Sequence, residues 1–226
     1  MRHLISTDRF RTALFAFALV LAGCSGNPLS PSTPAPNTLV YDAPVSLTIK
    51  NGALLPGTSI AYGGKTDTGA SKLILTGLIA PKQVGDSVDW QGTPIPDVAV
   101  KLGLRVGPFD DQSITLIGTS HIEIKNVSIK PGGTPGTALM EFSAPVSVSL
   151  KKGDFIPGSK VAYGGSTTDG AQFLGIDGYQ FRKSLDSLQY VGRINPRAFL
   201  RLDLRVLSFS DSSAVLGGTA NIRLEQ

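Results

Sequence analysis

The stretch that decides the fold is VAVKLGLRV at residues 98–106, which has a second version, AFLRLDLRV, at residues 198–206. In both versions an apolar residue stands at every second position, and most residues between are charged or glycine. Such alternation is typical of a β-strand with one face in a core and the other in water. The same half-buried strand is therefore predicted twice in one chain.

The repeated strand belongs to a longer internal duplication. Matching segments recur at an offset of 101 residues in the first part of each copy and 100 residues in the later part. They are APVS at 43–46 and 144–147, AYGG at 61–64 and 162–165, and LRV at 104–106 and 204–206. Several matches at a nearly fixed period indicate repeated structural units.

We predict an all-β protein with two tandem repeats of about 85 residues, at 38–125 and 139–226, separated by a Gly/Pro-rich linker at 126–138. Each repeat is expected to form a small antiparallel barrel or sandwich of about six strands, with turns at dipeptides such as Asn51-Gly52 and Pro56-Gly57. A single sheet shared by both copies is the alternative. The sequence alone gives no strand order.

The composition supports a packed β protein and gives no sign of a nucleic-acid partner. Of the 226 residues, 41% are hydrophobic and 17% are charged, which is enough apolar material for a core. The formal net charge is +4, but three arginines and one aspartate belong to the first 23 residues, which leaves 18 basic and 16 acidic residues. Nucleic-acid-binding proteins normally concentrate basic residues on one face, so we expect no nucleic acid among the partners.

Residues 1–23 have the parts of a bacterial secretory signal peptide. Arg2, Arg9 and Arg11 precede a ten-residue apolar run, ALFAFALVLA, at residues 13–22. A membrane-spanning helix needs ~20 apolar residues, about twice the length of this run. The run therefore fits the apolar region of a cleaved leader better than a transmembrane helix.

The leader ends in Leu21-Ala22-Gly23-Cys24, which resembles the lipobox of bacterial lipoproteins. The resemblance covers only the first 24 residues, and no family is recognised in residues 38–226. It implies cleavage before Cys24, lipidation of the Cys24 thiol and attachment to a membrane of the cell envelope. Ser25 in place of aspartate resembles the outer-membrane class, if the cell is Gram-negative. Cys24 is the only cysteine, so no intramolecular disulfide can form.

Residues 24–37 are predicted to be a tether between the lipid and the folded part. After Cys24 the sequence reads SGNPLSPSTPAPN, which is rich in Pro and Ser and has almost nothing to bury. In an extended, polyproline-like state of ~3 Å per residue, such a segment spans up to ~40 Å.

A second resemblance concerns Asp67-Thr68-Gly69-Ala70, which is similar to the active-site signature of aspartic proteases. That family uses two aspartates that share a proton and activate water. The second copy reads Thr168-Asp169-Gly170-Ala171, so the order is changed and no second signature exists. A Gly-rich hairpin turn explains both copies and is the favoured interpretation. The resemblance at Asp67 leaves an envelope hydrolase, similar to an aspartic protease, as the alternative function.

Other catalytic and metal-binding chemistry has few candidates. Outside the leader the only histidine is His121, and Asn221 stands at its position in the second copy. His121 falls on the polar face of a predicted strand, which favours a surface histidine over a base or a metal ligand. The sequence has no phosphate-binding loop and no dinucleotide fingerprint, so we expect no cofactor and no metal.

The second copy differs from the first in its basic residues. Arg197, Arg201 and Arg205 are spaced by four residues and therefore share one face of the strand at 198–206. With Asp203 between two of them, an ordinary solvated face is one interpretation. The functional interpretation is a site for an anionic envelope polymer or an acidic protein partner. The sequence thus predicts a lipid-anchored envelope protein with a non-catalytic binding or structural role.

Overall fold

The computed structural model describes residues 37–226, and every regular element in this part of the chain is a β-strand. The all-β prediction is therefore confirmed. The predicted signal peptide, the predicted lipidation at Cys24 and nearly all of the predicted tether lie outside the described residues. Residues 37–226 contain no helix that is both long and apolar enough to cross a membrane.

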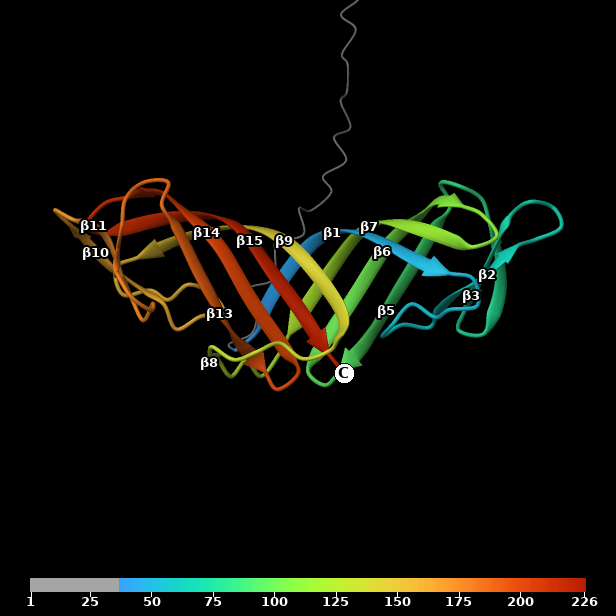
Figure 1. The fold of residues 1–226 in the computed structure, drawn as a ribbon, viewed down its shortest axis with the longest axis horizontal. Helices are drawn as coiled ribbons and strands as arrows, with labels where there is room; N and C mark the ends of the chain where they lie inside the picture. Colours follow the sequence, from blue (N-terminus) through green and yellow to red (C-terminus); the bar gives the residue numbers. More distant parts are fainter. Residues whose placement is uncertain (1–36) are drawn as a thin grey trace, which may run out of the picture. The chain divides into compact units, whose positions relative to one another are not determined.

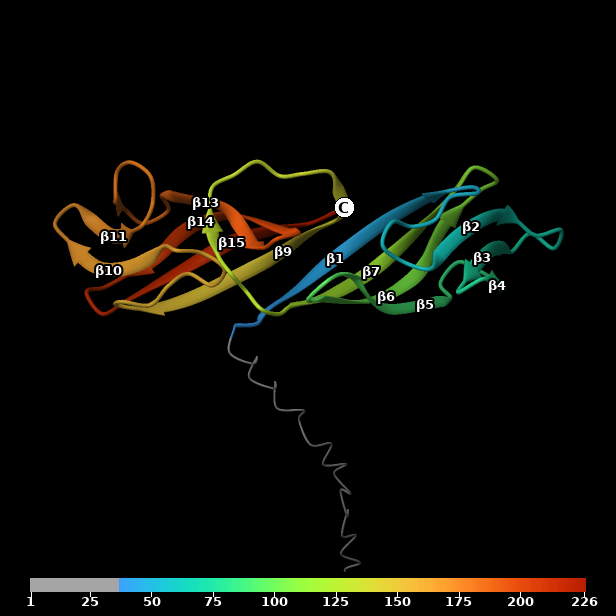
Figure 2. The ribbon, with the colours of Figure 1, turned by 90° about the horizontal axis from the view of Figure 1, so that it is seen from below.

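The described part of the first half has seven strands in two antiparallel sheets (Figure 1). The larger sheet has the order β1-β7-β6-β5, and the smaller has the order β2-β3-β4. The strands are β1 (Leu39–Lys50), β2 (Ile60–Lys65), β3 (Ser71–Leu75), β4 (Leu78–Lys82), β5 (Ser87–Ile95), β6 (Val98–Phe109) and β7 (Ser113–Ile124). Figure 2 shows β2, β3 and β4 grouped together.

The second half has the same strand order. Its larger sheet runs β9-β15-β14-β13, which corresponds to β1-β7-β6-β5, and its smaller sheet runs β10-β11-β12, which corresponds to β2-β3-β4. The strands are β9 (Ala138–Lys151), β10 (Ala162–Thr167), β11 (Gly170–Leu174), β12 (Phe181–Arg182), β13 (Ser187–Asn195), β14 (Ala198–Phe209) and β15 (Ser213–Glu225). An additional short strand, β8 (Lys130–Pro131), pairs with the edge of β13. The segment at 126–138, predicted as a linker, therefore contributes a strand to the sheet of the second half.

The first half has seven strands where about six were predicted, and two of them form a short hairpin. Strands β3 and β4 are joined by two residues, Thr76 and Gly77, which both have positive φ, at 50° and 85°. Positive φ at both turn residues is the geometry of a type I′ hairpin, which follows the natural twist of the strands. Threonine is rarely found in this conformation, and so the dipeptide gave no clear turn signal.

The alternating residues of β6 and β14 form the centre of the hydrophobic core. The inward side chains are at most 2% exposed; they are Val98, Val100, Leu102, Leu104, Val106, Ala198, Leu200, Leu202, Leu204 and Val206. They belong to one cluster with the inward residues of the neighbouring strands. The prediction of a half-buried strand at both places is confirmed.

Strands β1 and β9 each form one edge of a larger sheet. They pack against each other, but no hydrogen-bonded ladder joins them, so the two sheets remain separate. Pro44 lies in the middle of β1 and Pro145 at the matching place in β9. Proline has no N–H to donate, and it is a common means of blocking further strand pairing at a sheet edge.

The turns at Gly57 and Gly158 make reciprocal contacts between the halves. A Cβ atom on Gly57 would lie 3.0 Å from Sδ of Met140 on β9, and a Cβ atom on Gly158 would lie 3.2 Å from Cδ1 of Leu39 on β1. Leu39 and Met140 are themselves matching positions, 101 residues apart. Both glycines also have positive φ, at 73° and 77°. Glycine is therefore required at both turns by backbone conformation and by close packing.

A reversed pair of large and small residues distinguishes the outer faces of the two halves. In the first half, Cδ1 of Ile117 on β7 would lie 3.3 Å from a Cβ atom on Gly107 of β6. In the second half the sizes are exchanged, and Cδ1 of Leu207 on β14 would lie 2.9 Å from a Cβ atom on Gly217 of β15. Each large side chain thus occupies the space that its glycine partner leaves open.

The repeated AYGG segment ties the small sheet to the larger one in both halves. The hydroxyl of Tyr62 donates to the carbonyl of Asp110, and the hydroxyl of Tyr163 donates to the carbonyl of Ser210. Both tyrosine side chains are completely buried. This shared contact gives the motif a folding role.

Leu185 adopts a backbone conformation that leucine disfavours. Its φ is 70°, while Gly85, at the matching turn of the first half, has φ of 93°. Both residues donate their N–H to a strand carbonyl, Leu185 to Val206 at 2.7 Å and Gly85 to Val106 at 2.8 Å. The Leu185 side chain is 64% exposed, so little burial compensates for the strain.

We expect Leu185→Gly to stabilise the protein by about 1 kcal/mol. The left-handed conformation costs an L-residue ~1–2 kcal/mol, and part of this gain is offset because glycine loses more conformational entropy on folding. Urea denaturation should show a higher midpoint. The matched change Gly85→Ala should lower the midpoint by a similar free energy. A lower midpoint for Leu185→Gly would contradict this account of the turn.

Candidate functional site

The outer face of β14, β15 and β9 carries an ordered array of side chains. Strand pairing aligns them in three rows across the sheet. The rows are Phe199 with Arg223 and Glu141, Arg201 with Asn221 and Ser143, and Asp203 with Thr219 and Pro145. We call these nine residues the outer grid.

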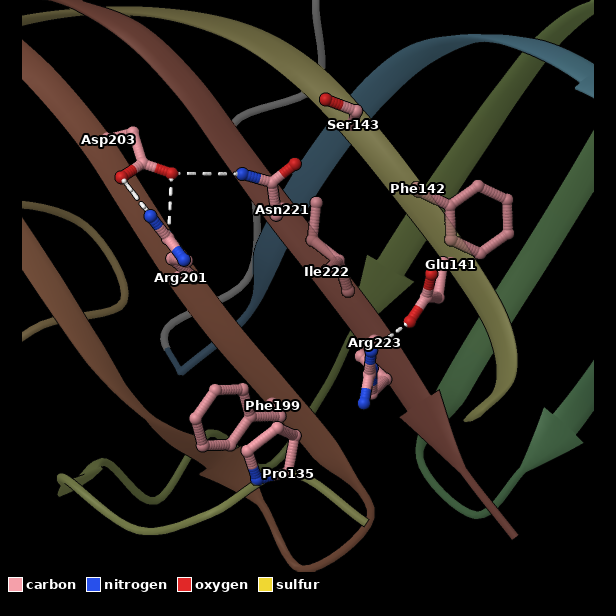
Figure 3. Close-up of a pocket in the computed structure, with 10 residues that line it drawn as sticks. All are labelled: Pro135, Glu141, Phe142, Ser143, Phe199, Arg201, Asp203, Asn221, Ile222 and Arg223. Atoms are coloured by element: carbon pink, nitrogen blue, oxygen red, sulfur yellow. Dashed lines mark hydrogen bonds and ion pairs between the residues drawn. The ribbon is translucent and has the colours of Figure 1, made fainter. Parts of the chain in front are cut away.

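The regular geometry of the sheet sets the spacing of the outer grid. Neighbouring strands lie ~4.8 Å apart, and residues two positions apart on one strand lie ~6.7 Å apart. Seven grid residues line a cavity of about 430 Å³ (Figure 3). Pro135, from the segment before β9, forms another part of the lining. The cavity thus lies over three adjacent strands.

The charges in the outer grid are paired. Nε of Arg201 lies 2.9 Å from Oδ2 of Asp203, and its Nη2 lies 3.1 Å from Oδ1. The amide nitrogen of Asn221 donates to the same Asp203 carboxylate at 3.2 Å. Arg223 forms an ion pair with Glu141 across the sheet. Two guanidinium groups therefore neutralise two carboxylates, and the hydrogen bonds and charge of Asp203 raise the pKa of Arg201 further.

The segment that carries Pro135 is held in place by an ion pair at the end of the chain. The carboxylate of Glu225 accepts a hydrogen bond from the N–H of Gly136 at 2.6 Å and forms an ion pair with Arg193. Arg193 also donates to the carbonyl of Thr134 at 3.1 Å. The segment predicted as a plain linker is thus fixed against β13 and β15, where it forms one wall of the cavity.

The Arg193–Glu225 pair also supports the floor of the cavity. The Glu225 side chain is only 8% exposed, and the Arg193 guanidinium lies 5.8 Å from the ring centroid of Phe199. Burial alone would raise the pKa of Glu225, but hydrogen bonds from Arg193 and Gly136 and the positive charges of Arg193 and Arg223 lower it overall. The folded structure therefore favours the charged form of Glu225.

Of the three arginines singled out in the sequence, only Arg201 belongs to the outer grid. Arg197 is exposed in the turn before β14. Arg205 lies farther along β14, where its guanidinium donates to the carbonyl of Leu185 at 3.0 Å. Arg105 makes the matching bond to the carbonyl of Gly85 at 2.9 Å, so this contact is common to both halves. The structure therefore does not bring the three arginines into one cluster.

The grid residues on β9 and β15 were not among the site residues predicted from the sequence. Glu141, Ser143 and Arg223 each occupy outward positions of alternating strands, which is a signal that the sequence does contain. Their alignment with Arg201 became visible only with the strand order. Pro135 carried no signal, because its position depends on the contact between Gly136 and Glu225, 89 residues apart.

The matching face of the first half has a different set of side chains. Its rows are Ala99 with Glu123 and Val40, Lys101 with His121 and Asp42, and Gly103 with Thr119 and Pro44. His121 is at the surface, where its Nδ1 lies 2.7 Å from Oδ1 of Asp42. The network of Arg201, Asp203 and Asn221 is thus absent from this face.

The aspartate considered for proteolysis lies away from the outer grid. Asp67 is exposed in the turn between β2 and β3, where the hydroxyl of Thr66 lies 2.9 Å from that of Thr68 and accepts from the N–H of Ala70. Asp169 is exposed in the matching turn of the second half. Across residues 37–226, no group of three or more His, Cys, Asp or Glu side chains is arranged to hold a metal ion.

Comparisons of the chain with protein-family models, with curated proteins and with solved structures found no match. The side chains of the outer grid and the sequence of the leader are therefore the features of the chain that bear on its function.

We expect Glu225→Gln to lower the free energy of unfolding by about 1–2 kcal/mol at neutral pH, because the Arg193 guanidinium loses its charged partner. The folded-state pKa of Glu225 is lowered, so its charged form stabilises the fold above the unfolded pKa of ~4.3. This contribution is lost as the pH falls through the folded-state pKa.

The difference between wild type and variant should therefore shrink between about pH 7 and about pH 3, as measured by urea denaturation at each pH. Glu141→Gln is the matched control, since its exposed ion pair should contribute at most ~1 kcal/mol. A Glu225→Gln difference that stays constant down to about pH 3 would show that its charge has no part in holding the segment.

Proposed function

We propose that the protein is a lipid-anchored lipoprotein of the cell envelope with a non-catalytic binding role, and that the outer grid is its binding surface. The lipobox-like sequence Leu21-Ala22-Gly23-Cys24 supports the anchor. Each buried CH₂ of an acyl chain adds ~0.8 kcal/mol to membrane binding, so two or more chains on Cys24 hold the protein firmly. Ser25 favours the outer membrane if the cell is Gram-negative.

The observation that carries the binding role is the difference between the two outer faces. The inward residues of β6 and β14 are similar, while the outward ones differ. Phe199 stands at the position equivalent to Ala99, and Asp203 at the position equivalent to Gly103. Strands β6 and β7 of the first half pair in the same register as β14 and β15 without such a network. A polar network that occurs in one half and lines a cavity supports a ligand-binding role there.

The contacts of the carboxylates favour binding over catalysis. A general acid or base must be within hydrogen-bond reach of the proton that it transfers, whereas both carboxylates of the grid already contact a guanidinium group. Asp203 is held by Arg201 and Asn221, and Glu141 is held by Arg223. The alternative of an envelope hydrolase depends on Asp67, which lies in an exposed turn with no matching aspartate at its position in the second half.

The anchor is tested by mass spectrometry of the protein purified from its own membranes. We expect the mass of residues 24–226 plus acyl chains, and we expect Cys24→Ser to abolish both the lipid and membrane association. A mature protein without lipid, or one cut elsewhere, would exclude anchoring through Cys24.

The binding surface is tested by retention of the purified lipoprotein, in detergent, on envelope material from the same cells. Arg201→Ala combined with Asn221→Ala should weaken retention about tenfold, or ~1.4 kcal/mol. The control combines Lys101→Ala with His121→Ala, the matching positions of the first half, and should leave retention unchanged. Equal retention of the two double variants would exclude the outer grid as the binding surface.

A further inference from the structure

We infer that the ligand of the outer grid is a neutral, hydroxyl-rich polymer, that is, an uncharged glycan. The inference rests on the proposed binding role of the grid and specifies the class of ligand. Three properties of the grid support it: its charge balance, its unused hydrogen-bonding groups and its dimensions.

The charge balance of the grid opposes a polyanion. Arg201 and Arg223 are the basic groups that line the cavity, and each is already paired with a carboxylate that also lines it. An anionic polymer would have to displace Asp203 and Glu141 from their partners or bind beside them against like charge. An uncharged ligand meets neither obstacle, because it leaves both ion pairs in place.

The unused polar atoms of the grid match the chemistry of hydroxyl groups. Within residues 37–226, no hydrogen bond engages Oδ1 of Asn221, the hydroxyl of Ser143 or Nη1 of Arg201. These atoms are an acceptor, a group that both donates and accepts, and a donor. A sugar hydroxyl also both donates and accepts, so neighbouring hydroxyls can bond to two of these groups at once.

The three groups also stand in one row, which makes their spacing regular. Arg201, Asn221 and Ser143 lie side by side on β14, β15 and β9. With ~4.8 Å between strands, the row is ~10 Å long, and the row of Phe199 lies ~6.7 Å away. This area suits one or two sugar rings, and a cavity of about 430 Å³ is within the usual range for ligand sites.

The cavity offers an apolar contact beside these polar groups. Pro135 belongs to the segment fixed by Glu225, and it lines the same cavity as Phe199 (Figure 3). One face of a sugar ring consists of C–H groups, which can pack on the proline ring. Because strands and ion pairs hold the lining side chains, little conformational entropy is lost when a ligand binds.

The test uses the full-length lipoprotein in detergent and calorimetric titration with defined probes. The neutral probes are maltoheptaose, cellohexaose, laminarihexaose and chitohexaose, and the anionic probes are alginate oligomers and dextran sulfate. We expect a neutral probe to bind with a Kd that changes less than about twofold between about 50 mM and 500 mM NaCl, because no ion pair forms with the ligand.

The variants identify the groups that make the contact. Asn221→Ala and, separately, Ser143→Ala should each raise the Kd about fivefold or more, the size expected for a lost hydrogen bond. His121→Ala, at the matching position of the first half, should not change the Kd. Ser143→Ala removes a single exposed hydroxyl, and thermal unfolding of each variant checks that it folds.

The outcomes separate this inference from the proposed function. One outcome is that only an anionic probe binds, that its binding depends on salt, and that the combined change Arg197→Gln, Arg201→Gln and Arg205→Gln weakens it. This would overturn the inference of a neutral glycan but leave the proposed binding role in place. Retention on envelope material that depends on the grid, with no neutral probe bound, would also overturn the glycan and indicate a protein partner. Retention independent of the grid would overturn the binding role itself.

Discussion

Burial of the leucines of β14 is the constraint on which the rest of the second half depends. Leu200, Leu202 and Leu204 are at most 2% exposed. A shift of one residue in the pairing of β14 would turn them toward water and place Arg201 and Asp203 in the core. The apolar face therefore sets the register, and the register aligns the outer grid across three strands. The polar site is a geometric consequence of hydrophobic burial on the opposite face.

Local patterns predicted the strands, and non-local contacts produced the site. The alternation around Arg201 showed which residues of β14 face outward, because side-chain direction depends only on neighbours in the chain. Asn221 and Glu141 come from strands whose place in the sheet depends on pairing over long distances in the chain. Arg205 shares the outward face, as expected, but its partner is the Leu185 carbonyl, set by a turn 20 residues earlier. The sequence offered no means of foreseeing that contact.

The two halves share a core and divide the remaining tasks. Both have the same pairing of long strands and the same tyrosine contact to the small sheet. The second half fixes the intervening segment against its sheet through the Arg193–Glu225 pair, and Lys125 and Thr93 stand at the matching positions of the first half. Both halves therefore have the same strand framework, and the second half adds the Pro135 segment and the polar side chains that line the cavity.

The exchanged sizes at Ile117 and Leu207 bear on the fidelity of folding. Related halves in one chain are prone to misassembly, in which a strand pairs with the wrong copy. If β6 paired with β15, Gly107 would meet Gly217 and leave a gap. If β14 paired with β7, Leu207 and Ile117 would compete for the same space. Each of these strands thus fits its own neighbour by shape, and both of these mispairings would lose packing.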